Sequence, residues 1–464
     1  MRSAFQCVSL AGLIVAGTVS AGVVSVPFEK RYLDNDLAPS LLRRDGTINL
    51  DALNNITGGG YYAQLSIGTP PQNLSFHLDT GSSDTWVNSN EADLCTNRSS
   101  YEPLPNAPFN ITYLDGRHIQ GRYFKDTVTI NGAEIKDQQL GLALKSVHGT
   151  GLMGLGFSQS VATTSKYPTV VDNMVSQKII PVPAFSLYLN DLQTSKGTIL
   201  FGGVDTDKFH GGLATLPLQP LPSSVSSSRA IKTYNVQLNG FTASGVQVPS
   251  VNAGAILDSG STITLLPENV VQPIWNHFGV QRIPGLSIPF IDCAKANSKG
   301  VSFDFHFTNK TIKVPLDEVV INNLASVQDE LLQDQQLKKY FGGWSGVCMF
   351  GFSSTSNYGI LASDFVLLGD TFLRSAYVVY DLQNKQIGIA QATLNATTSS
   401  IVEFQAGSES IPGPVATGDD SDNSADSGSS NTSTESAGAM PYPAFSIAVA
   451  GTMLTTLSMM VNAL

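Results

Sequence analysis

The chain has 464 residues, enough for one large two-lobed unit or for about two to three domains. Its hydrophobic content of 42% suffices for a sizeable core, and its four cysteines are too few for a disulfide-based scaffold. The formal net charge of −11 at pH 7 argues against nucleic acid as a partner.

The N-terminal part of the chain has the pattern of a segment that is removed during secretion. Residues 1–21 form a predicted signal peptide, with a basic residue, an apolar stretch and a small-residue cleavage site. A membrane anchor is the alternative, but the apolar run is too short to span a bilayer easily. Residues 22–44 form a predicted propeptide ending in the basic pair Arg43-Arg44, so we expect the mature chain to start at Asp45.

Asp79 is an acidic residue placed after an apolar run and beside glycine and hydroxyls. Phe76, His77 and Leu78 predict the end of a buried strand, and Gly81 would permit the sharp turn that follows. This pattern indicates a carboxylate that is held by the protein rather than solvated. On its own it is too short to assign a catalytic role.

The same layout recurs in the second half of the chain. Ala255, Ile256 and Leu257 precede Asp258, which is followed by Ser-Gly-Ser. A motif doubled at domain-scale spacing indicates two related halves that each contribute one carboxylate to a shared site. Two unrelated solvated turns are the alternative, but they do not explain the matching apolar flanks.

Two facing carboxylates have a defined chemistry. Because like charges about 3 Å apart cannot both ionise easily, Asp79 and Asp258 would share one proton. The ionised member can draw a proton from water while the protonated member donates to a carbonyl oxygen. Such a pair hydrolyses amides without a covalent intermediate, a metal or another cofactor. The neighbouring residues would support the pair: Thr80, Gly81, Ser82, Ser259, Gly260 and Ser261.

With these motifs, the sequence over about residues 60 to 395 resembles the pepsin-like aspartic proteases, in particular the fungal yapsin and candidapepsin branch. The segment 61–71, an alternating strand ending in Gly-Thr-Pro-Pro, is part of the resemblance. The resemblance implies an all-β, bilobal fold with the active-site cleft between two β-rich lobes and Asp79 and Asp258 as its catalytic pair. We place the N-terminal lobe at 45–200 and the C-terminal lobe at 201–398.

The resemblance also implies a flap that closes over bound peptide. A tight turn at Asp115-Gly116 predicts its hairpin, with Tyr113 as the working residue and as the partner of the Trp86 indole N–H. Relatives usually carry glycine after this tyrosine, whereas this chain has Leu114, which stiffens the tip. Asp115 resembles the flap acid of fungal members that accept a basic side chain next to the scissile bond. An ordinary surface hairpin with a turn-forming aspartate is the alternative.

His77 stands where relatives usually carry an aliphatic residue. Strand residues two apart share a face, so His77 would point the same way as Asp79. A histidine there could titrate near neutrality and change the pH range of the pair. We favour the simpler interpretation of a hydrogen-bonded wall residue without a catalytic role.

The cysteines and sequons fit a secreted protein. The resemblance pairs Cys293 with Cys348 and leaves Cys95 free or blocked, because Cys7 departs with the signal peptide. We expect several Asn-x-(Ser/Thr) sequons to carry glycans, and one on Asn110 would crowd the flap. The sequons are at Asn55, Asn73, Asn97, Asn110, Asn309, Asn395 and Asn431.

The C-terminal part has two compositionally distinct segments. Residues 399–438 are rich in Ser, Thr, Asp and Gly and predict a disordered stalk rather than a domain. Residues 439–464 contain no Lys, Arg, Asp or Glu and end in an apolar stretch, which is typical of a GPI-attachment signal. A transmembrane helix is the alternative, but no basic residue follows the tail.

Together these features predict a secreted, monomeric aspartic endopeptidase that is anchored in the membrane through a GPI lipid and acts on peptides and proteins. A catalytically silent wall glycoprotein that binds peptides or wall polymers is the alternative. Such a protein would be expected to lose an aspartate or its glycine, and neither is lost. A metal hydrolase is disfavoured because no histidine cluster with ligand spacing occurs in the sequence.

Overall fold

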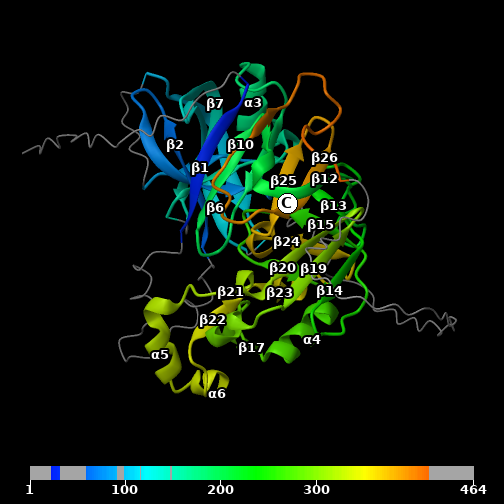
Figure 1. Ribbon diagram of the computed structural model, residues 1–464. Helices are drawn as coiled ribbons and strands as arrows, with labels where there is room; N and C mark the ends of the chain where they lie inside the picture. The colour runs from blue at the N-terminus through cyan, green and yellow to red at the C-terminus, as the bar shows by residue number, and fades with distance from the viewer. Residues whose placement is uncertain (1–21, 32–58, 91–98, 115, 147–148, 417–464) are drawn as a thin grey trace, which may run out of the picture.

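The computed structural model describes residues 22–31, 59–90, 99–114, 116–146 and 149–416. They form a mostly β structure with two lobes, and Figure 1 shows the strands β2, β6 and β7 at one end and β22, α5 and α6 at the other. The largest sheet has 13 strands in the order β12-β26-β25-β9-β10-β1-β2-β3-β8-β4-β7-β6-β5. This sheet contains the strands of the N-terminal lobe and continues into strands from the second half of the chain, β12, β25 and β26.

The N-terminal lobe is built from the strands on one side of that sheet and one short helix. Its elements are β2 (Gly60–Ile67), β3 (Gln72–Asp79), β4 (Trp86–Asn88), β5 (Glu102–Thr112), β6 (His118–Ile130), β7 (Ala133–Lys145), β8 (Gly151–Gly154) and α3 (Val170–Ser176). The remaining strands of the large sheet come from both halves of the chain. They are β1 (Val24–Arg31), β9 (Ala184–Tyr188), β10 (Lys196–Phe201), β12 (Phe209–Pro217), β25 (Ala376–Asp381) and β26 (Gln386–Ala392).

The C-terminal lobe holds three smaller sheets and the longest helix of the described residues, α4. Its strands are β13 (Asn235–Leu238), β14 (Gly240–Ala243), β15 (Ala253–Leu257), β16 (Thr264–Leu266), β17 (Gln281–Arg282), β18 (Pro289–Asp292), β19 (Ser302–Phe307), β20 (Lys310–Pro315), β21 (Val320–Ile321), β22 (Val347–Phe350), β23 (Phe352–Ser354) and β24 (Phe365–Leu368). Its helices are α4 (Glu268–Phe278), α5 (Gln328–Gln333), α6 (Lys338–Phe341) and α7 (Asp370–Leu373).

The two lobes repeat one local arrangement around the two aspartates. In the first lobe, β3 runs parallel to β8, with Asp79 opposite Gly154. In the second, β15 runs parallel to β24, with Leu257 opposite Leu368. A Cβ on Gly154 would lie 2.4 Å from the Ser83 backbone, so a glycine is needed for the close approach behind the first motif.

The predicted boundary between the lobes needs a correction, and part of the predicted propeptide is a strand. Residue 200 falls inside β10 of the shared sheet, so the lobes are joined through that sheet rather than at a linker. Residues 24–31 of the predicted propeptide form β1, which pairs with β10 on one side and β2 on the other. Residues 24–31 are therefore an integral part of the large sheet.

The predicted stalk also begins later than residue 399. The segment 393–416 forms a strap that includes β27 (Ile401–Glu403), paired with β11 (Gly203–Asp205). Its side chains Phe404 and Ile411 are buried against Tyr377 and Val379 of β25. The prediction that residues 399–416 belong to a disordered stalk was wrong. Two apolar residues, Phe404 and Ile411, suffice to pack this Ser-rich segment onto the fold.

The strap covers the face of β25 that points away from the aspartates. Tyr377 and Val379 face the strap, whereas Val378 and Tyr380 belong to the main core between the lobes. Lys208 fastens the strap by donating to the carbonyl oxygens of Ala396 and Thr398, at 2.9 and 2.7 Å.

This packing predicts that the strap is part of the folded unit. A chain that stops after residue 416 should unfold at the temperature of the longer protein. A chain that stops after residue 392 should lose about 3 kcal/mol or more of its free energy of unfolding, because the burial of Phe404 and Ile411 is lost. Thermal unfolding followed by circular dichroism measures both, and equal midpoints for the two truncations would contradict the prediction.

Candidate active site

Asp79 and Asp258 stand at equivalent places in the two lobes and face each other. Asp79 is the last residue of β3, and Asp258 directly follows β15. A Cβ on Gly81 would lie 2.4 Å from Oδ1 of Asp258, and one on Gly260 would lie 2.3 Å from Oδ1 of Asp79. Each glycine is therefore needed to admit the carboxylate of the other lobe. The chain bends at both glycines as expected, but neither has a positive φ, so the close approach of the opposing carboxylate is what requires glycine there.

Each carboxylate is oriented by the turn that follows it. The backbone N–H of Gly81 donates to Oδ1 of Asp79 at 2.8 Å, and the Ser82 hydroxyl donates to Oδ2. The second turn repeats this pattern, with Gly260 N–H donating to Oδ1 of Asp258 at 2.9 Å and the Ser261 hydroxyl donating to Oδ2 at 2.8 Å. The two carboxylates thus present their remaining lone pairs to the same space.

Reciprocal hydrogen bonds join the two turns across the lobes. The Thr80 hydroxyl donates to the carbonyl of Leu257 at 2.8 Å and accepts from the Ser259 N–H at 2.9 Å. The Ser259 hydroxyl donates to the carbonyl of Leu78 at 3.0 Å and accepts from the Thr80 N–H at 3.2 Å. Because both side chains are buried, these bonds fix the separation of the aspartates.

The pair is arranged to hold one proton. Asp79 and Asp258 are only 4% and 6% exposed, and this burial raises the pKa of both carboxyls. The negative charge of Asp258 acts in addition on Asp79, whose pKa is raised to about 7. The two carboxyls therefore titrate as a coupled pair that keeps a single proton.

The flap tyrosine lies beside this pair. The indole N–H of Trp86 donates to the hydroxyl of Tyr113 at 2.8 Å, which is the partner predicted from the sequence. Burial and the nearby Asp79 raise the pKa of Tyr113 well above its usual value, so its hydroxyl stays protonated. Tyr113 directly follows β5. The last residue of β5, Thr112, pairs with His118 of β6. Asp115 lies outside the described residues.

His77 lies on the wall of the N-terminal lobe. Its ring stacks on Tyr62, with ring centroids 5.1 Å apart. A Cβ on Gly60 would lie 2.5 Å from Nε2 of His77, so the imidazole fills the space above that glycine. His77 therefore packs against Tyr62 and Gly60 of β2, and its lack of a catalytic role stays a prediction.

The sequence analysis missed a buried carboxylate close to the flap. Asp84 accepts hydrogen bonds from the hydroxyls of Tyr123 and Tyr167, at 2.7 and 2.5 Å, and from the N–H of Ala162 at 2.6 Å. Burial raises the pKa of its carboxyl. The available signal was the comparison of the two motifs, because the counterpart of Asp84 after Asp258 is the apolar Ile263.

A second missed feature is a group of buried charges beneath the Asp258 turn. Arg374 donates to the Glu318 carboxylate and to its backbone carbonyl. Asp370, whose N–H donates to the Ser261 carbonyl at 2.8 Å, is buried, and burial raises its pKa to about 8. Lys30 of β1 is buried in the same region, which lowers its pKa to about 7. These residues lie far apart in the sequence, so no local pattern predicts their contact.

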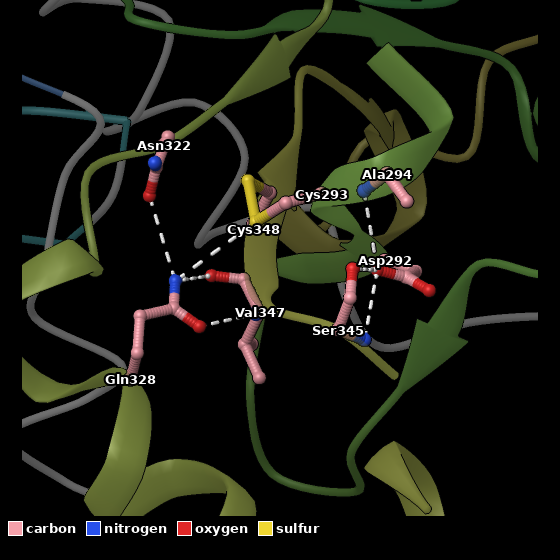
Figure 2. Close-up of a disulfide and its surroundings, with 8 residues drawn as sticks. All are labelled: Asp292, Cys293, Ala294, Asn322, Gln328, Ser345, Val347 and Cys348. Atoms are coloured by element: carbon pink, nitrogen blue, oxygen red, sulfur yellow. Dashed lines mark hydrogen bonds between the residues drawn. A yellow bond between two sulfur atoms is a disulfide. The ribbon is translucent and has the colours of Figure 1, made fainter. Parts of the chain in front are cut away.

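The disulfide between Cys293 and Cys348 is present, with the two Cα atoms 5.0 Å apart. Figure 2 shows that Gln328 brackets the neighbouring Val347, accepting from its N–H at 2.6 Å and donating to its carbonyl at 2.7 Å. The disulfide ties β22 to the short 3-10 helix that follows β18. Cys7 and Cys95 lie outside the described residues.

Four predicted glycosylation sites lie within the described residues. Asn73, Asn110 and Asn309 are exposed on strands or a tight turn. Asn395 is also exposed, but its side-chain amide donates to the Asp191 carboxylate, which a glycan would have to replace. Asn55, Asn97 and Asn431 lie outside the described part of the chain.

The described residues show neither a metal site nor a membrane-spanning helix. Within them, no group of three or more His, Cys, Asp or Glu side chains is placed to hold a metal ion. The same residues contain no helix that is long and apolar enough to cross a membrane. The predicted apolar tail at 439–464 lies outside them.

The match to a family model agrees with this geometry. Residues 60–392 match the model of the eukaryotic aspartyl proteases. The chain belongs to this family. It is 34% identical over 414 residues to "Probable aspartic-type endopeptidase opsB" of Aspergillus oryzae, covering 84% of this chain and 80% of that protein. It is 32% identical over 362 residues to "Candidapepsin-4" of Candida albicans, covering 74% of this chain and 78% of that protein.

The fold agrees with that assignment. The crystal structure of the aspartic proteinase from Irpex lacteus aligns with a TM-score of 0.60 at 20% sequence identity. The alignment covers 82% of this chain and 100% of that one, which shows the bilobal pepsin-like fold. The chain is thus an aspartic-type endopeptidase, as its sequence motifs predicted.

Replacing one carboxyl of the pair tests its role. Asp79→Asn keeps the shape but removes the acid, so kcat/KM should fall by about a thousandfold or more. Asp137→Asn makes the same chemical change at an exposed position of β7 and should leave the rate unchanged. Initial rates on a fluorogenic peptide measure both. An Asp79→Asn enzyme with the normal rate would exclude this carboxyl from the chemistry.

The pKa shifts also predict a bell-shaped dependence of kcat/KM on pH. Activity needs one proton on the pair, so the rate should fall as the pH rises through about 7, where that proton is lost. It also needs one ionised carboxyl, so the rate should fall again at low pH, where both carboxyls are protonated. His77→Val should leave both limbs in place. A rate that stays constant beyond about pH 8 would contradict the shared proton.

Proposed function

We propose that this protein is a secreted proenzyme that matures into a GPI-anchored endopeptidase and cleaves extracellular peptides and proteins with Asp79 and Asp258. The observation that carries the proposal is the placement of two oriented carboxylates on either side of one space. Ionised Asp258 would accept a proton from the attacking water. Protonated Asp79 would donate to the carbonyl oxygen of the scissile amide.

Surrounding residues supply what this chemistry requires. The Thr80–Ser259 hydrogen bonds keep the carboxyls close enough to share the proton. Tyr113 closes over the site from the flap and is held by Trp86. Burial of the pair strengthens the interaction of each carboxyl with a reacting group because little water competes.

Inhibitor classes separate this proposal from the alternatives. A statine-type transition-state analogue should inhibit the protein, whereas a metal chelator should not. A catalytically silent wall glycoprotein would bind the analogue without any turnover of a peptide. Absence of peptide cleavage by the fully processed protein over the whole acidic range would overturn the proposed activity.

The proenzyme part of the proposal rests on β1. Residues 24–31 occupy a place within the shared sheet, and Phe28 is buried there. Cleavage after Arg44 would cut the covalent link between β1 and the lobe that begins at β2. N-terminal sequencing of the secreted protein should give Gly22 before maturation and Asp45 after it. A mature chain that still begins at Gly22 would contradict this assignment.

Surface anchoring is supported by the composition of residues 417–464, with a polar segment followed by an uncharged apolar tail. Secretion is supported by a relative named "Secreted aspartic protease 4". Treatment of cells with a phosphatidylinositol-specific phospholipase should release active enzyme. A chain that stops after residue 416 should instead accumulate in the medium. Enzyme that stays with the membrane after lipase treatment would favour a transmembrane tail.

A preference for basic residues near the scissile bond is supported by Asp115 at the predicted flap tip. Asp115→Asn should lower kcat/KM about tenfold for a peptide with Lys next to the scissile bond, because a charge pair is lost. The same change should leave a matched peptide with Leu at that position unaffected. Equal effects on the two peptides would assign Asp115 to the turn alone.

A further inference from the structure

The flap tip makes an apolar contact with the opposite lobe. Leu114 directly follows the flap tyrosine, is partly buried, and packs against a hydrophobic cluster. Every other member of that cluster, buried or partly buried, lies between Leu192 and Leu367. Leu114 is therefore the one residue of the N-terminal lobe in this C-terminal cluster of described residues. The cluster includes Ile256 and Ile263, which flank Asp258 in the sequence.

Two consecutive residues of the flap are thus held by different lobes. Tyr113 accepts the hydrogen bond from Trp86 and packs against the N-terminal cluster around that indole. Leu114 packs against the C-terminal lobe. Two backbone hydrogen bonds close the turn at the flap tip. Tyr113 N–H donates to the Arg117 carbonyl, and Gly116 N–H donates to the Tyr113 carbonyl, both at 2.9 Å. The flap tip therefore bridges the lobes above the aspartates.

We propose that Leu114 is a latch that holds the flap closed in the free enzyme and sets the rate at which a polypeptide enters. An apolar side chain that is removed from water on closing stabilises the closed state relative to the open one. A ligand that needs the open state then associates more slowly, in proportion to the fraction of open molecules. A glycine, which relatives usually carry here, has no side chain to make this contact.

Leu114 is less exposed than other leucines on the surface of the described structure. Leu144 of β7 and Leu361 of the C-terminal lobe are 53% and 85% exposed, so the structure leaves such side chains uncovered where nothing packs on them. Leu114 is covered although it lies in a turn at the end of a hairpin. Closure of the flap supplies the covering surface.

A latch can also be distinguished by experiment from a residue that forms the wall of a substrate pocket. A pocket wall would change the choice between substrate side chains and would leave the entry step unaltered. A latch changes the entry rate for every ligand, whatever its side chains, and leaves the chemical step unaltered once the flap has closed. The association rate constant and kcat are therefore the informative pair of measurements.

The test uses the processed enzyme with Leu114→Ala, Leu114→Gly and the control Leu144→Ala. Stopped-flow mixing with a statine-type inhibitor gives the association rate constant, and peptide hydrolysis gives kcat. We expect association about fivefold faster for Leu114→Ala, and faster still for Leu114→Gly, because about half the burial of one leucine is lost. We expect kcat within about twofold of the wild type, and no change for Leu144→Ala.

Unchanged or slower association in both Leu114 variants would overturn the latch and would leave the proposed role of the aspartates untouched. A second measurement on the unaltered enzyme covers the case in which the variants do not fold. Hydrogen exchange of the Tyr113 and Gly116 amides should be slow in the free enzyme, because the latched tip keeps its two backbone hydrogen bonds. Exchange as fast as that of an exposed turn would overturn the latch.

Discussion

The reciprocal hydrogen bonds between Thr80 and Ser259 are the constraint on which the rest of this structure depends. Each hydroxyl donates to a backbone carbonyl of the other lobe and accepts a backbone N–H from it. A break in this contact would leave buried donors and acceptors unpaired, which is costly. The lobes therefore cannot separate at this point without a large penalty, and the aspartates stay within reach of each other.

The same constraint explains the residues around the aspartates. Once the turns are this close, a side chain at Gly81 or Gly260 would collide with the opposing carboxylate. Once the carboxylates are this close and buried, they cannot both be charged, and the raised pKa of Asp79 follows. Chemistry that needs one acid and one base is thus a consequence of how the two lobes meet.

Much of this architecture could be predicted from the sequence because the motif occurs twice. The repetition indicated two lobes and a shared site around Asp79 and Asp258, and the family match shows the bilobal fold. Other features depend on tertiary contacts that no local pattern encodes. The ion pair of Arg374 with Glu318 and the three hydrogen bonds to Asp84 arise only after distant segments pack. The strap was missed because a Ser-rich composition hid two buried apolar residues, Phe404 and Ile411.

The position of the single proton is the most direct test of this account. Neutron diffraction from crystals of the processed enzyme at about pH 5 would locate deuterium at the two carboxyls. The account predicts one deuteron between them, bonded to Asp79, and an ionised Asp258. Two ionised carboxylates, or a deuteron on each, would contradict it.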